Sequence, residues 1–413
     1  MEYQCIHRCQ TVERMGGVNM VGNAKDLFVQ RAERLTKAFR HEIPDRVPIT
    51  LMLETWAGHY AGNSIVDIGY DYQKLKESIF KVAEDFPEID ALPPAFGIRP
   101  GNVYAAAASR EFRHYDDDGK PYASVQHTEA GDVMLAEEYD ELIADPFKFI
   151  IEKQIPRRYA AFDKPGDKKT MAMGMMATSF ATYMSEGIAA VGGGLATRYG
   201  MPTLFKGSTE MALDVLMDYF RGFNNIMMDI RRRKDKVIAA VEALHPLMLR
   251  RAAQGVESGL FPAIFIPLHI PTYLKPKDFE TFYFPTFRKM IETLISYDMT
   301  PMLFMEGDWE PYFDFINELP KKKVVGLIEA GEFKKYKNEI GDTICLTGGM
   351  SVDLINHGTK QEVINQTKYL IDTLAPDGGY IFCLDKSLLA PKDANAENLK
   401  AAFETVTTYG VYK

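Results

Sequence analysis

The chain has 413 residues, of which 46% are hydrophobic and 25% are charged, and its formal net charge at pH 7 is −9. This composition is typical of a globular protein with a large core, and the acidic balance disfavours nucleic acid and anionic membrane surfaces as partners. The length accommodates two average domains or one large α/β barrel with insertions.

The sequence has no long uninterrupted apolar segment and no signal peptide, so we expect a cytoplasmic protein. Its four cysteines are too few and too scattered for a disulfide framework. Cys5, His7 and Cys9 are residues of the kinds that bind metal ions. They lie, however, in a segment without the periodicity of a helix or strand. We therefore expect residues 1–24 to form a tail and residues 25–413 to form one domain.

Short apolar runs alternate with helical segments along this domain. Because most of these runs are continuous, they are typical of strands covered on both faces, as in a parallel sheet with helices outside it. The eight predicted strands are residues 46–54, 88–95, 169–177, 260–269, 299–306, 323–329, 342–349 and 379–385. Eight β–α steps predict a (β/α)8 TIM barrel.

Two segments do not fit the simple repeat. Residues 97–165 contain Asp118-Gly119 between alternating runs, which predicts a β-hairpin. Residues 202–255 have almost wholly helical periodicity and carry a charged run at 231–236. We expect both insertions to cap the barrel mouth.

Ionisable side chains stand at or just after most of the predicted strands. In such barrels the chemistry lies where strands end and βα loops begin, so these side chains are expected to converge on one site. They are Glu54 with His59 and Tyr60, then Tyr183, His269, Glu306, Glu329, and finally Cys383, Asp385 and Lys386. For any one residue, the alternative is that a strand end is simply where the chain meets water.

Aromatic residues also lie near the predicted strand ends and indicate an apolar pocket. These are Trp56, Phe180, Phe304 and Trp309. Such a pocket suits a methoxylated aromatic better than a thiol or a quaternary amine, although a cation would also bind aromatic faces.

Four stretches of the chain resemble the uroporphyrinogen decarboxylase superfamily. They are RLTKAFRHEIPDRVPI (34–49), ATSFATYMSEG (177–187), YLKPKDFETFYFP (273–285) and the segment 358–410. The resemblance implies a (β/α)8 barrel, in agreement with the strand pattern. It also implies one of two activities: decarboxylation of a tetrapyrrole, or methyl transfer to or from the cobalt of a corrinoid protein.

The motif of the decarboxylase branch is altered in this chain. That branch has RQAGRY after the first strand, where this chain has TWAGHY, with Thr55 and His59 in place of the two arginines. A polycarboxylate substrate needs guanidinium groups, so the resemblance implies that tetrapyrrole decarboxylation is lost. Tyr183 matches the superfamily's tyrosine in Thr-Tyr-Met-x-Glu-Gly.

The zinc motif of the thiol-using methyltransferases is also altered. These enzymes have His-x-Cys-Gly at the end of the fifth strand and a further cysteine after the eighth, which together hold zinc. Here the fifth-strand motif is Phe304-Met305-Glu306-Gly307, and the later cysteine falls at or near Lys386. The resemblance therefore implies that the His/Cys/Cys zinc ligands are absent.

Three roles for Glu306 remain open. It can form a buried ion pair with Lys386, join His269 or Glu329 in an oxygen and nitrogen metal site, or act as an acid, base or polar anchor for the substrate. His269 is the natural proton donor near neutral pH, with a satisfied core histidine as the alternative.

The resemblance implies a corrinoid-dependent methyltransferase of O-demethylase type in anaerobic metabolism, with a corrinoid (cobalamin) carried by a partner protein. The expected methyl donor is a small methylated substrate, with an aromatic methyl ether as the best fit. The alternatives are a decarboxylase or other lyase that acts on a different acid, and a non-catalytic binding protein. Lys386 and Arg198 are the cations available to a lyase, and a homodimer is possible by analogy with relatives.

These expectations assign roles to particular residues. The predicted catalytic residues are His269, Glu306, Tyr183 and Lys386. The predicted substrate-binding residues are Glu54, Trp56, His59, Phe180, Phe304, Glu329 and Asp385. No metal ligand is predicted.

Overall fold

The computed structural model describes residues 23–95, 97–127, 133–253 and 263–413. Residues 1–22 of the predicted tail, with the Cys5, His7 and Cys9 group, lie outside these residues, whereas Ala24, also assigned to the tail, is buried and begins helix α2 (Ala24–Phe39). Among the described residues, no helix is both long and apolar enough to cross a lipid bilayer.

Eight parallel strand segments form a closed barrel. Six of them are hydrogen-bonded in sequence order: β3 (Gly207–Ser208), β4 (Ala263–Leu268), β5 (Thr300–Met305), β6 (Val325–Ile328), β7 (Cys345–Met350) and β8 (Tyr380–Leu384). The first two segments are held by single parallel bridges. Ile49 pairs with Phe382 and Thr50 with Ala91, which joins β8 through the first segment to the second. Leu92 pairs with Thr203, which joins the second segment to the third and closes the ring.

The (β/α)8 prediction is therefore confirmed. Seven of the eight predicted strands overlap the observed ones. The third strand was wrong: residues 169–177 lie inside a helix, and the third strand runs from Thr203 to Ser208, in a region that was expected to be almost wholly helical. Methionine and alanine make up six of the nine residues 169–177, and both are strong helix formers, whereas an apolar run alone does not separate a strand from a helix.

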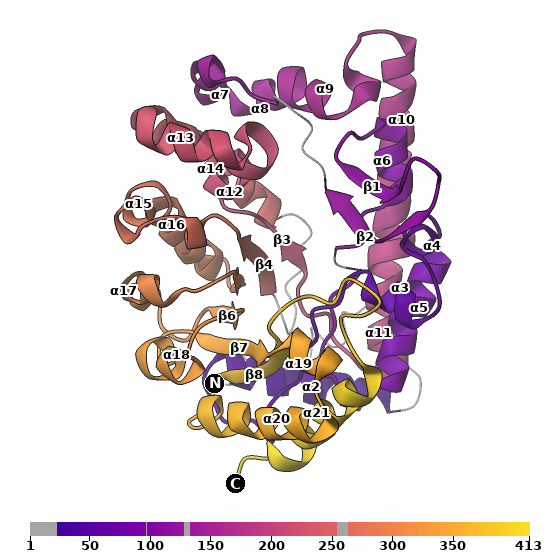
Figure 1. Cartoon of the computed structure of the whole chain (residues 1–413), viewed down its shortest axis with the longest axis vertical. Coiled ribbons are helices and arrows are strands. Elements are labelled where there is room, and N and C mark those ends of the chain that lie inside the picture. The colour runs from indigo at the N-terminus through magenta and orange to yellow at the C-terminus, as the bar shows by residue number, and fades with distance from the viewer. Residues whose placement is uncertain (1–22, 96, 128–132, 254–262) are drawn as a thin grey trace, which may run out of the picture.

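Helices surround the strands. In Figure 1, α12 to α18 flank the strands on one side, α20 and α21 lie below them, and α10 and α11 form one long rod along the other edge. The helices are α2 (Ala24–Phe39), α3 (Trp56–Tyr60), α4 (Ile65–Tyr70), α5 (Tyr72–Asp85), α6 (Gly101–Ala107), α7 (Tyr139–Ala144), α8 (Pro146–Phe149), α9 (Ile155–Arg158), α10 (Asp167–Thr182), α11 (Ala190–Tyr199), α12 (Ala212–Leu216), α13 (Phe223–Arg232), α14 (Lys234–Ala253), α15 (Pro276–Phe282), α16 (Phe284–Ser296), α17 (Phe313–Asn317), α18 (Phe333–Ile340), α19 (Val352–His357), α20 (Lys360–Leu374) and α21 (Ala396–Tyr409).

The predicted hairpin is confirmed. Strands β1 (Phe112–Tyr115) and β2 (Pro121–His127) pair antiparallel around the Asp118-Gly119 turn. Gly119 has φ +78°, a conformation that glycine adopts at little cost. The hairpin packs against α4, beside the ends of the first two strand segments.

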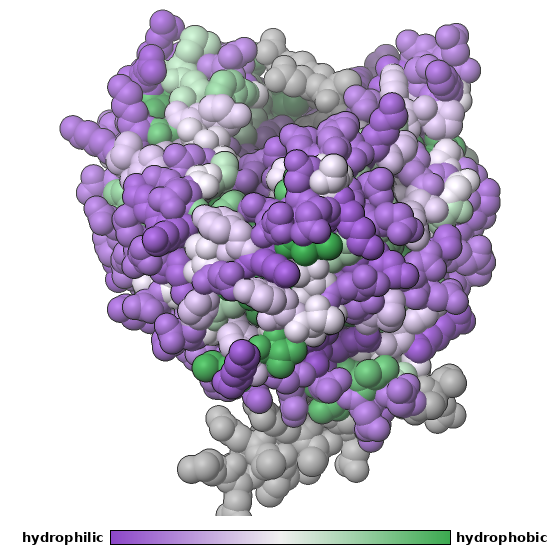
Figure 2. All heavy atoms as spheres, turned by 60° about the horizontal axis from the view of Figure 1, so that its bottom comes forward, coloured by the Kyte–Doolittle hydropathy of each residue, from purple (hydrophilic) through white to green (hydrophobic). Residues whose placement is uncertain are grey.

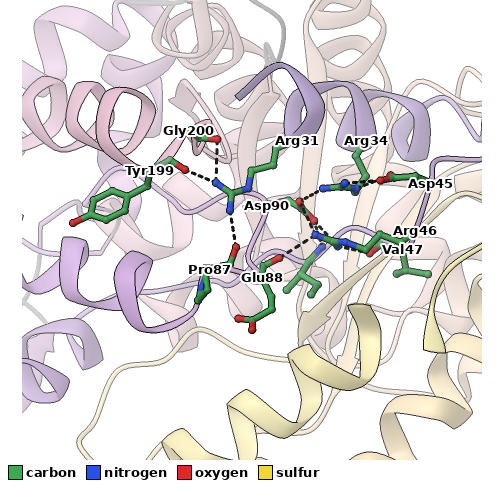
Figure 3. Close-up of polar contacts among 11 residues, drawn as sticks. Arg31, Arg34, Asp45, Arg46, Val47, Pro87, Glu88, Asp90, Tyr199 and Gly200 are labelled. Atoms are coloured by element: carbon green, nitrogen blue, oxygen red, sulfur yellow. Dashed lines mark hydrogen bonds and ion pairs between the residues drawn. The ribbon is translucent and has the colours of Figure 1, made fainter. Parts of the chain in front are cut away.

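A buried ion-pair cluster ties the amino-terminal ends of the first two strand segments to α2 (Figure 3). Asp90 is fully buried and pairs with Arg34 at 2.6 Å and with Arg46 at 2.9 Å. One oxygen of Asp90 also accepts the backbone N–H of Ile49 at 2.8 Å. Arg31 donates to the carbonyl oxygen of Gly200 and so connects α2 to the end of α11. These contacts fix one end of the barrel and leave the opposite, carboxyl end for the site.

The alternation of side chains along the strands explains why carboxylates stand at their tips. Phe265, Met302, Val325 and Cys345 belong to one buried cluster in the barrel interior, and Phe304 packs against it. Because side chains alternate with period two along a strand, the residue two positions after Phe304 also faces the interior. That residue is Glu306, so its carboxylate stands at the interior side of the barrel's carboxyl end.

Candidate active site at the carboxyl end of the barrel

His269 and Glu306 meet where β4 and β5 end. Leu268 and Met305 are paired in register, so the residues that follow them lie side by side. The Nδ1 atom of His269 lies 3.0 Å from Oε2 of Glu306. The structure therefore joins two of the predicted site residues directly.

Two aspartates from the chain after β3 complete this cluster. Asp214 lies in α12 and Asp218 lies one turn later, so both face the same side. Fully buried Asp214 accepts the backbone N–H groups of His269 at 3.0 Å and Ile270 at 2.8 Å, and Tyr283 donates its hydroxyl to the other oxygen at 2.6 Å. Oδ2 of Asp218 lies 4.0 Å from Nε2 of His269.

Burial and charge together shift the protonation of this cluster. Burial alone would lower the pKa of His269, but the hydrogen bond to Glu306 and the charges of Glu306, Asp214 and Asp218 raise that pKa to about 10. Burial raises the pKa of Asp214 to about 7 and the pKa of Asp218 to about 6, against the charge of His269. At neutral pH His269 therefore carries its proton, and two nearby carboxyl groups titrate close to neutrality.

Glu329, at the end of β6, binds the loop that follows Glu306. Its Oε2 accepts the backbone N–H of Gly307 at 2.6 Å, and its Oε1 lies 3.4 Å from Nζ of Lys386. Gly307 has φ +72°, and a Cβ atom there would lie 2.4 Å from Oγ1 of Thr272. The suggested Glu306–Lys386 pair is thus not formed, because Lys386 pairs with Glu329 instead.

Asp385 binds a neighbouring turn. One carboxylate oxygen accepts the backbone N–H of Val352 at 3.0 Å, at the start of α19. Burial raises the pKa of Asp385. Its carboxylate already has a structural partner, and its predicted substrate contact remains a prediction.

Glu54 and Arg99 share a small cavity of about 140 Å³ between the first two strand ends and the hairpin. Burial raises the pKa of Glu54, and the neighbouring Ser387 hydroxyl and the charge of Arg99 oppose this shift. Gly97 has φ +68°, and a Cβ atom there would lie 1.8 Å from Oε2 of Glu54. The glycine therefore leaves room for the carboxylate, and Arg99 stacks over the ring of Phe112 at 4.7 Å.

His59 lines a second, larger and open cavity of about 700 Å³ beside the hairpin. Its Nε2 lies 2.6 Å from the carbonyl oxygen of Ala123. Trp56 is 2% exposed and stacks on Tyr60 at 4.8 Å, so it belongs to the core rather than to either cavity. Phe304 packs against Phe265 below the strand tips, with ring centroids 6.2 Å apart.

Tyr183 and Phe180 do not follow the third strand as expected. Tyr183 begins a π-helical turn (Tyr183–Ala189) after α10, and its hydroxyl lies 3.4 Å from the carbonyl oxygens of Ala95 and Ile98. It therefore contacts the loop after the second strand segment, although it comes from a different element. The side chain of Phe180 is half exposed and packs near Tyr183, with ring centroids 6.5 Å apart.

Sequence reasoning missed Arg99, Asp214 and Asp218. Asp214 and Asp218 follow the true third strand with i, i+4 spacing, a signal that was hidden because the third strand was placed at 169–177. Arg99 lies four positions after the second predicted strand (88–95). Pro93 and Pro94 obscured where that strand ends.

A soft zinc site does not fit the cysteines that the structure describes. Cys345 and Cys383 are buried within β7 and β8, and burial raises the pKa of both thiols, which disfavours the thiolate form that binds metal. Over the described ranges, no three His, Cys, Asp or Glu side chains are arranged to hold a metal ion.

The comparisons with known proteins agree with this architecture. Residues 209–409 match the model of the uroporphyrinogen decarboxylase (URO-D) family, a region that holds the cluster around His269 but not Glu54, His59 or Tyr183. Among solved structures, the chain is similar to a methyltransferase from Methanosarcina mazei, with a TM-score of 0.61 and 16% identity. That alignment covers 92% of this chain and 98% of the other, and it shows the same fold. No curated protein matches the chain.

Proposed function

Because residues 209–409 match the uroporphyrinogen decarboxylase family, we propose that the chain is a member of this superfamily and a methyltransferase that demethylates a small methyl ether. The methyl acceptor would be the cobalt of a corrinoid, a co-substrate presented at the barrel mouth by a partner protein. The reduced corrinoid supplies the nucleophile, which suits an anaerobic, cytoplasmic setting. The task of the chain itself is to bind the ether and to stabilise its leaving group.

The observation that carries the proposal is the His269–Glu306 pair. When a methyl group leaves an ether, the electron pair of the broken C–O bond stays on oxygen, which then needs a proton. Glu306 occupies Nδ1 of His269, so Nε2, which lies 4.0 Å from Asp218, is the ring atom that would donate to a substrate. Nε2 keeps its proton at neutral pH because three carboxyl groups surround the ring. His269 is thus a suitable general acid for the leaving oxygen.

The pKa of His269 favours a phenol as the leaving group. A phenolic hydroxyl such as that of tyrosine has a pKa of about 10. The raised pKa of His269 keeps its ring protonated at neutral pH, so the ring can donate to the oxygen of a leaving phenolate, which is less basic than an alkoxide. An aryl methyl ether is therefore the substrate class that we propose.

An anaerobic assay with cob(I)alamin tests this function. Purified protein is mixed with cob(I)alamin or with candidate corrinoid proteins, and with a panel of methoxyaromatics, methylamines and methyl thioethers. We expect methylcobalamin to form with a methoxyaromatic and its free phenol to appear in equal amount. Formation with methylamines only would overturn the substrate class, and no formation with any corrinoid protein would overturn the methyltransferase proposal.

A second candidate, a decarboxylase of a non-tetrapyrrole acid, rests on Arg99. Its half-buried guanidinium lines the small cavity and provides a cation for a substrate carboxylate. The other cations considered are less suitable, because Lys386 pairs with Glu329 and Arg198 stacks over Phe80 at 5.2 Å. Release of CO2 from a panel of small aromatic acids, abolished by Arg99→Gln, would favour this candidate over methyl transfer.

A further inference from the structure

Asp214 is a buried carboxylate in an unfavourable place for a charge. Figure 2 shows a mainly hydrophilic outer face of the molecule, which is where charged side chains are usually found. Asp214, by contrast, has no exposed surface. Among the described residues, its hydrogen-bond partners are two backbone N–H groups and one tyrosine, and none is a lysine or arginine. Because a buried carboxylate lowers stability unless it is well paired, a role in the site is the better explanation for its presence.

The two N–H groups belong to the turn that begins where β4 ends. The last pair in register between β4 and β5 is Leu268 with Met305, so His269 and Ile270 lie just beyond the ladder. Both of their N–H groups are accepted by one oxygen of Asp214, Oδ1, at 3.0 Å and 2.8 Å. Ile270 has φ −78° and ψ −27°, so the backbone turns from extended to helical directly after His269. One buried oxygen therefore fixes the backbone at the point where it leaves the strand.

Tyr283, between α15 and α16, holds the other oxygen of Asp214. Its hydroxyl donates to Oδ2 at 2.6 Å, and its side chain is 1% exposed. Its ring packs among other aromatic rings, with centroids 5.3 Å from Phe279 and 5.8 Å from Phe287. Because such a core is closely packed, the hydroxyl cannot leave the carboxylate without displacing these rings. Both oxygens of Asp214 thus have fixed partners, and rotation of the carboxylate would break hydrogen bonds.

The side chain of His269 is held separately from its backbone. Glu306 lies 3.0 Å from Nδ1, whereas Asp214 binds the backbone N–H. A ring held at both places presents Nε2, which lies 4.0 Å from Asp218, in one direction. A fixed direction matters because proton donation to a leaving oxygen requires the donor atom to be aligned with it.

We infer that Asp214 and Tyr283 are positioning residues for His269, with Tyr283 acting through Asp214. The catalytic meaning of this inference rests on the proposed function, whereas the arrangement itself is a property of the protein alone. The charged and titratable groups around His269 are Glu306, Asp214 and Asp218, and those around Asp214 are His269, Asp218 and Tyr283. Replacing Tyr283 by phenylalanine removes a hydrogen bond and leaves all the carboxyl groups in place, so it separates position from charge.

NMR of the protein with 15N-labelled histidine tests the arrangement without any corrinoid. We expect Glu306 to protect the Nδ1 proton of His269 from exchange with water, and Tyr283→Phe to speed this exchange about tenfold. The matched control is Tyr139→Phe, because Tyr139 is also buried and donates its hydroxyl to a buried carboxylate, that of Asp229, at 2.9 Å. This control should leave the exchange of the His269 proton unchanged.

Asp214→Asn is a second variant that changes the charge and keeps the shape. Its amide oxygen can still accept the two N–H groups, and its amide nitrogen can donate to the hydroxyl of Tyr283. We expect His269 to titrate at a lower pH in this variant, because the charge of Asp214 raises the pKa of His269. An unchanged titration would overturn the link between Asp214 and His269.

Steady-state kinetics of methyl transfer complete the test. Tyr283→Phe should lower kcat about 10- to 100-fold with KM little changed, because the proton donor is misplaced and the binding surface is kept. Tyr139→Phe should keep the wild-type kcat. Equal exchange rates in the wild type and Tyr283→Phe, or equal changes in Tyr283→Phe and Tyr139→Phe, would overturn the inference. The NMR contrast without methyl transfer by the wild type would support the positioning role and overturn the proposed function instead.

Discussion

The Nδ1 atom of His269 lies 3.0 Å from Oε2 of Glu306, at the tips of two neighbouring strands of the barrel. This contact explains why an apolar strand ends on a carboxylate. Glu306 faces the interior end of the barrel and raises the pKa of His269, whose other ring nitrogen, Nε2, lies 4.0 Å from Asp218. The remaining carboxyl groups, Asp214 and Asp218, strengthen the same effect.

The charge state of His269 can be measured directly. With histidine labelled at 13Cε1, the protein shows signals from its eight histidines, and His269→Gln identifies the one from His269. We predict that this ring remains protonated well above pH 8, because its pKa is raised to about 10. Glu306→Gln removes the hydrogen-bonded carboxylate and should lower this pKa, while the control His59→Gln should leave it unchanged. A His269 signal that titrates near pH 6.5 in the wild type would refute the assignment.

The same pKa shift makes stability depend on pH. The pKa of His269 is raised from 6.5 to about 10 on folding, so its contribution is fully present below pH 6.5 and is lost as the pH rises toward 10. We predict that the difference in unfolding free energy between the wild type and His269→Gln shrinks across this window. Urea unfolding at several pH values checks this, and a constant difference would mean that His269 titrates normally.

Asp90 is predicted to be a stability residue rather than a catalytic one. Asp90→Ala leaves Arg34 and Arg46 without their buried partner, which costs about 3–5 kcal/mol in similar cases. Urea unfolding measures the loss. The control is Glu318→Gln, whose pair with Arg288 is exposed and is expected to contribute no more than about 1 kcal/mol. Equal losses in the two variants would contradict the role of the cluster in Figure 3.

Gly307 is predicted to be required for the loop after Glu306. Gly307→Ala combines a positive φ with a Cβ atom 2.4 Å from Thr272, and backbone strain of this kind costs about 1–3 kcal/mol. Gly193 in α11 is the matched control, because a Cβ atom there meets nothing within 4 Å. Gly193→Ala should therefore be neutral or stabilising by up to about 1 kcal/mol. Thermal unfolding of both variants distinguishes them, and an unaffected Gly307→Ala would show that the loop adapts.

Much of the fold could be predicted because buried parallel strands have a clear signal. The runs that became β4 to β8 are continuous, apolar and bounded by turn residues, and the residues after β4, β5 and β6 are the ionisable ones that the sequence singled out. The third strand could not be placed, because the strand segment at 203–208 is short and ends on polar residues. The longer apolar run at 169–177 was chosen instead, although its composition is that of a helix.

The site was predicted in part for the same reason. His269 and Glu306 could be anticipated because they end strands of unambiguous pattern. Asp214 and Arg99 are brought to the site by tertiary contacts, through hydrogen bonds to the backbone after β4 and through packing on the hairpin. No periodicity in a single sequence encodes such contacts. Tyr183 was misplaced for a different reason. The motif match put it after a strand at 169–177, but those residues lie in α10 and Tyr183 begins the π-helical turn that follows.

The most direct test of the central claim is the rate of methylcobalamin formation from a methoxyaromatic between pH 6 and pH 10, compared for the wild type and Glu306→Gln. If His269 donates the proton and Glu306 holds it charged, the wild-type rate should persist until the pH approaches 10. The rate of the variant should be lower by about 10²–10⁴-fold where its imidazole is neutral, and it should decline at a lower pH. Identical pH profiles and rates for the two proteins would contradict the claim that this pair assists the leaving group.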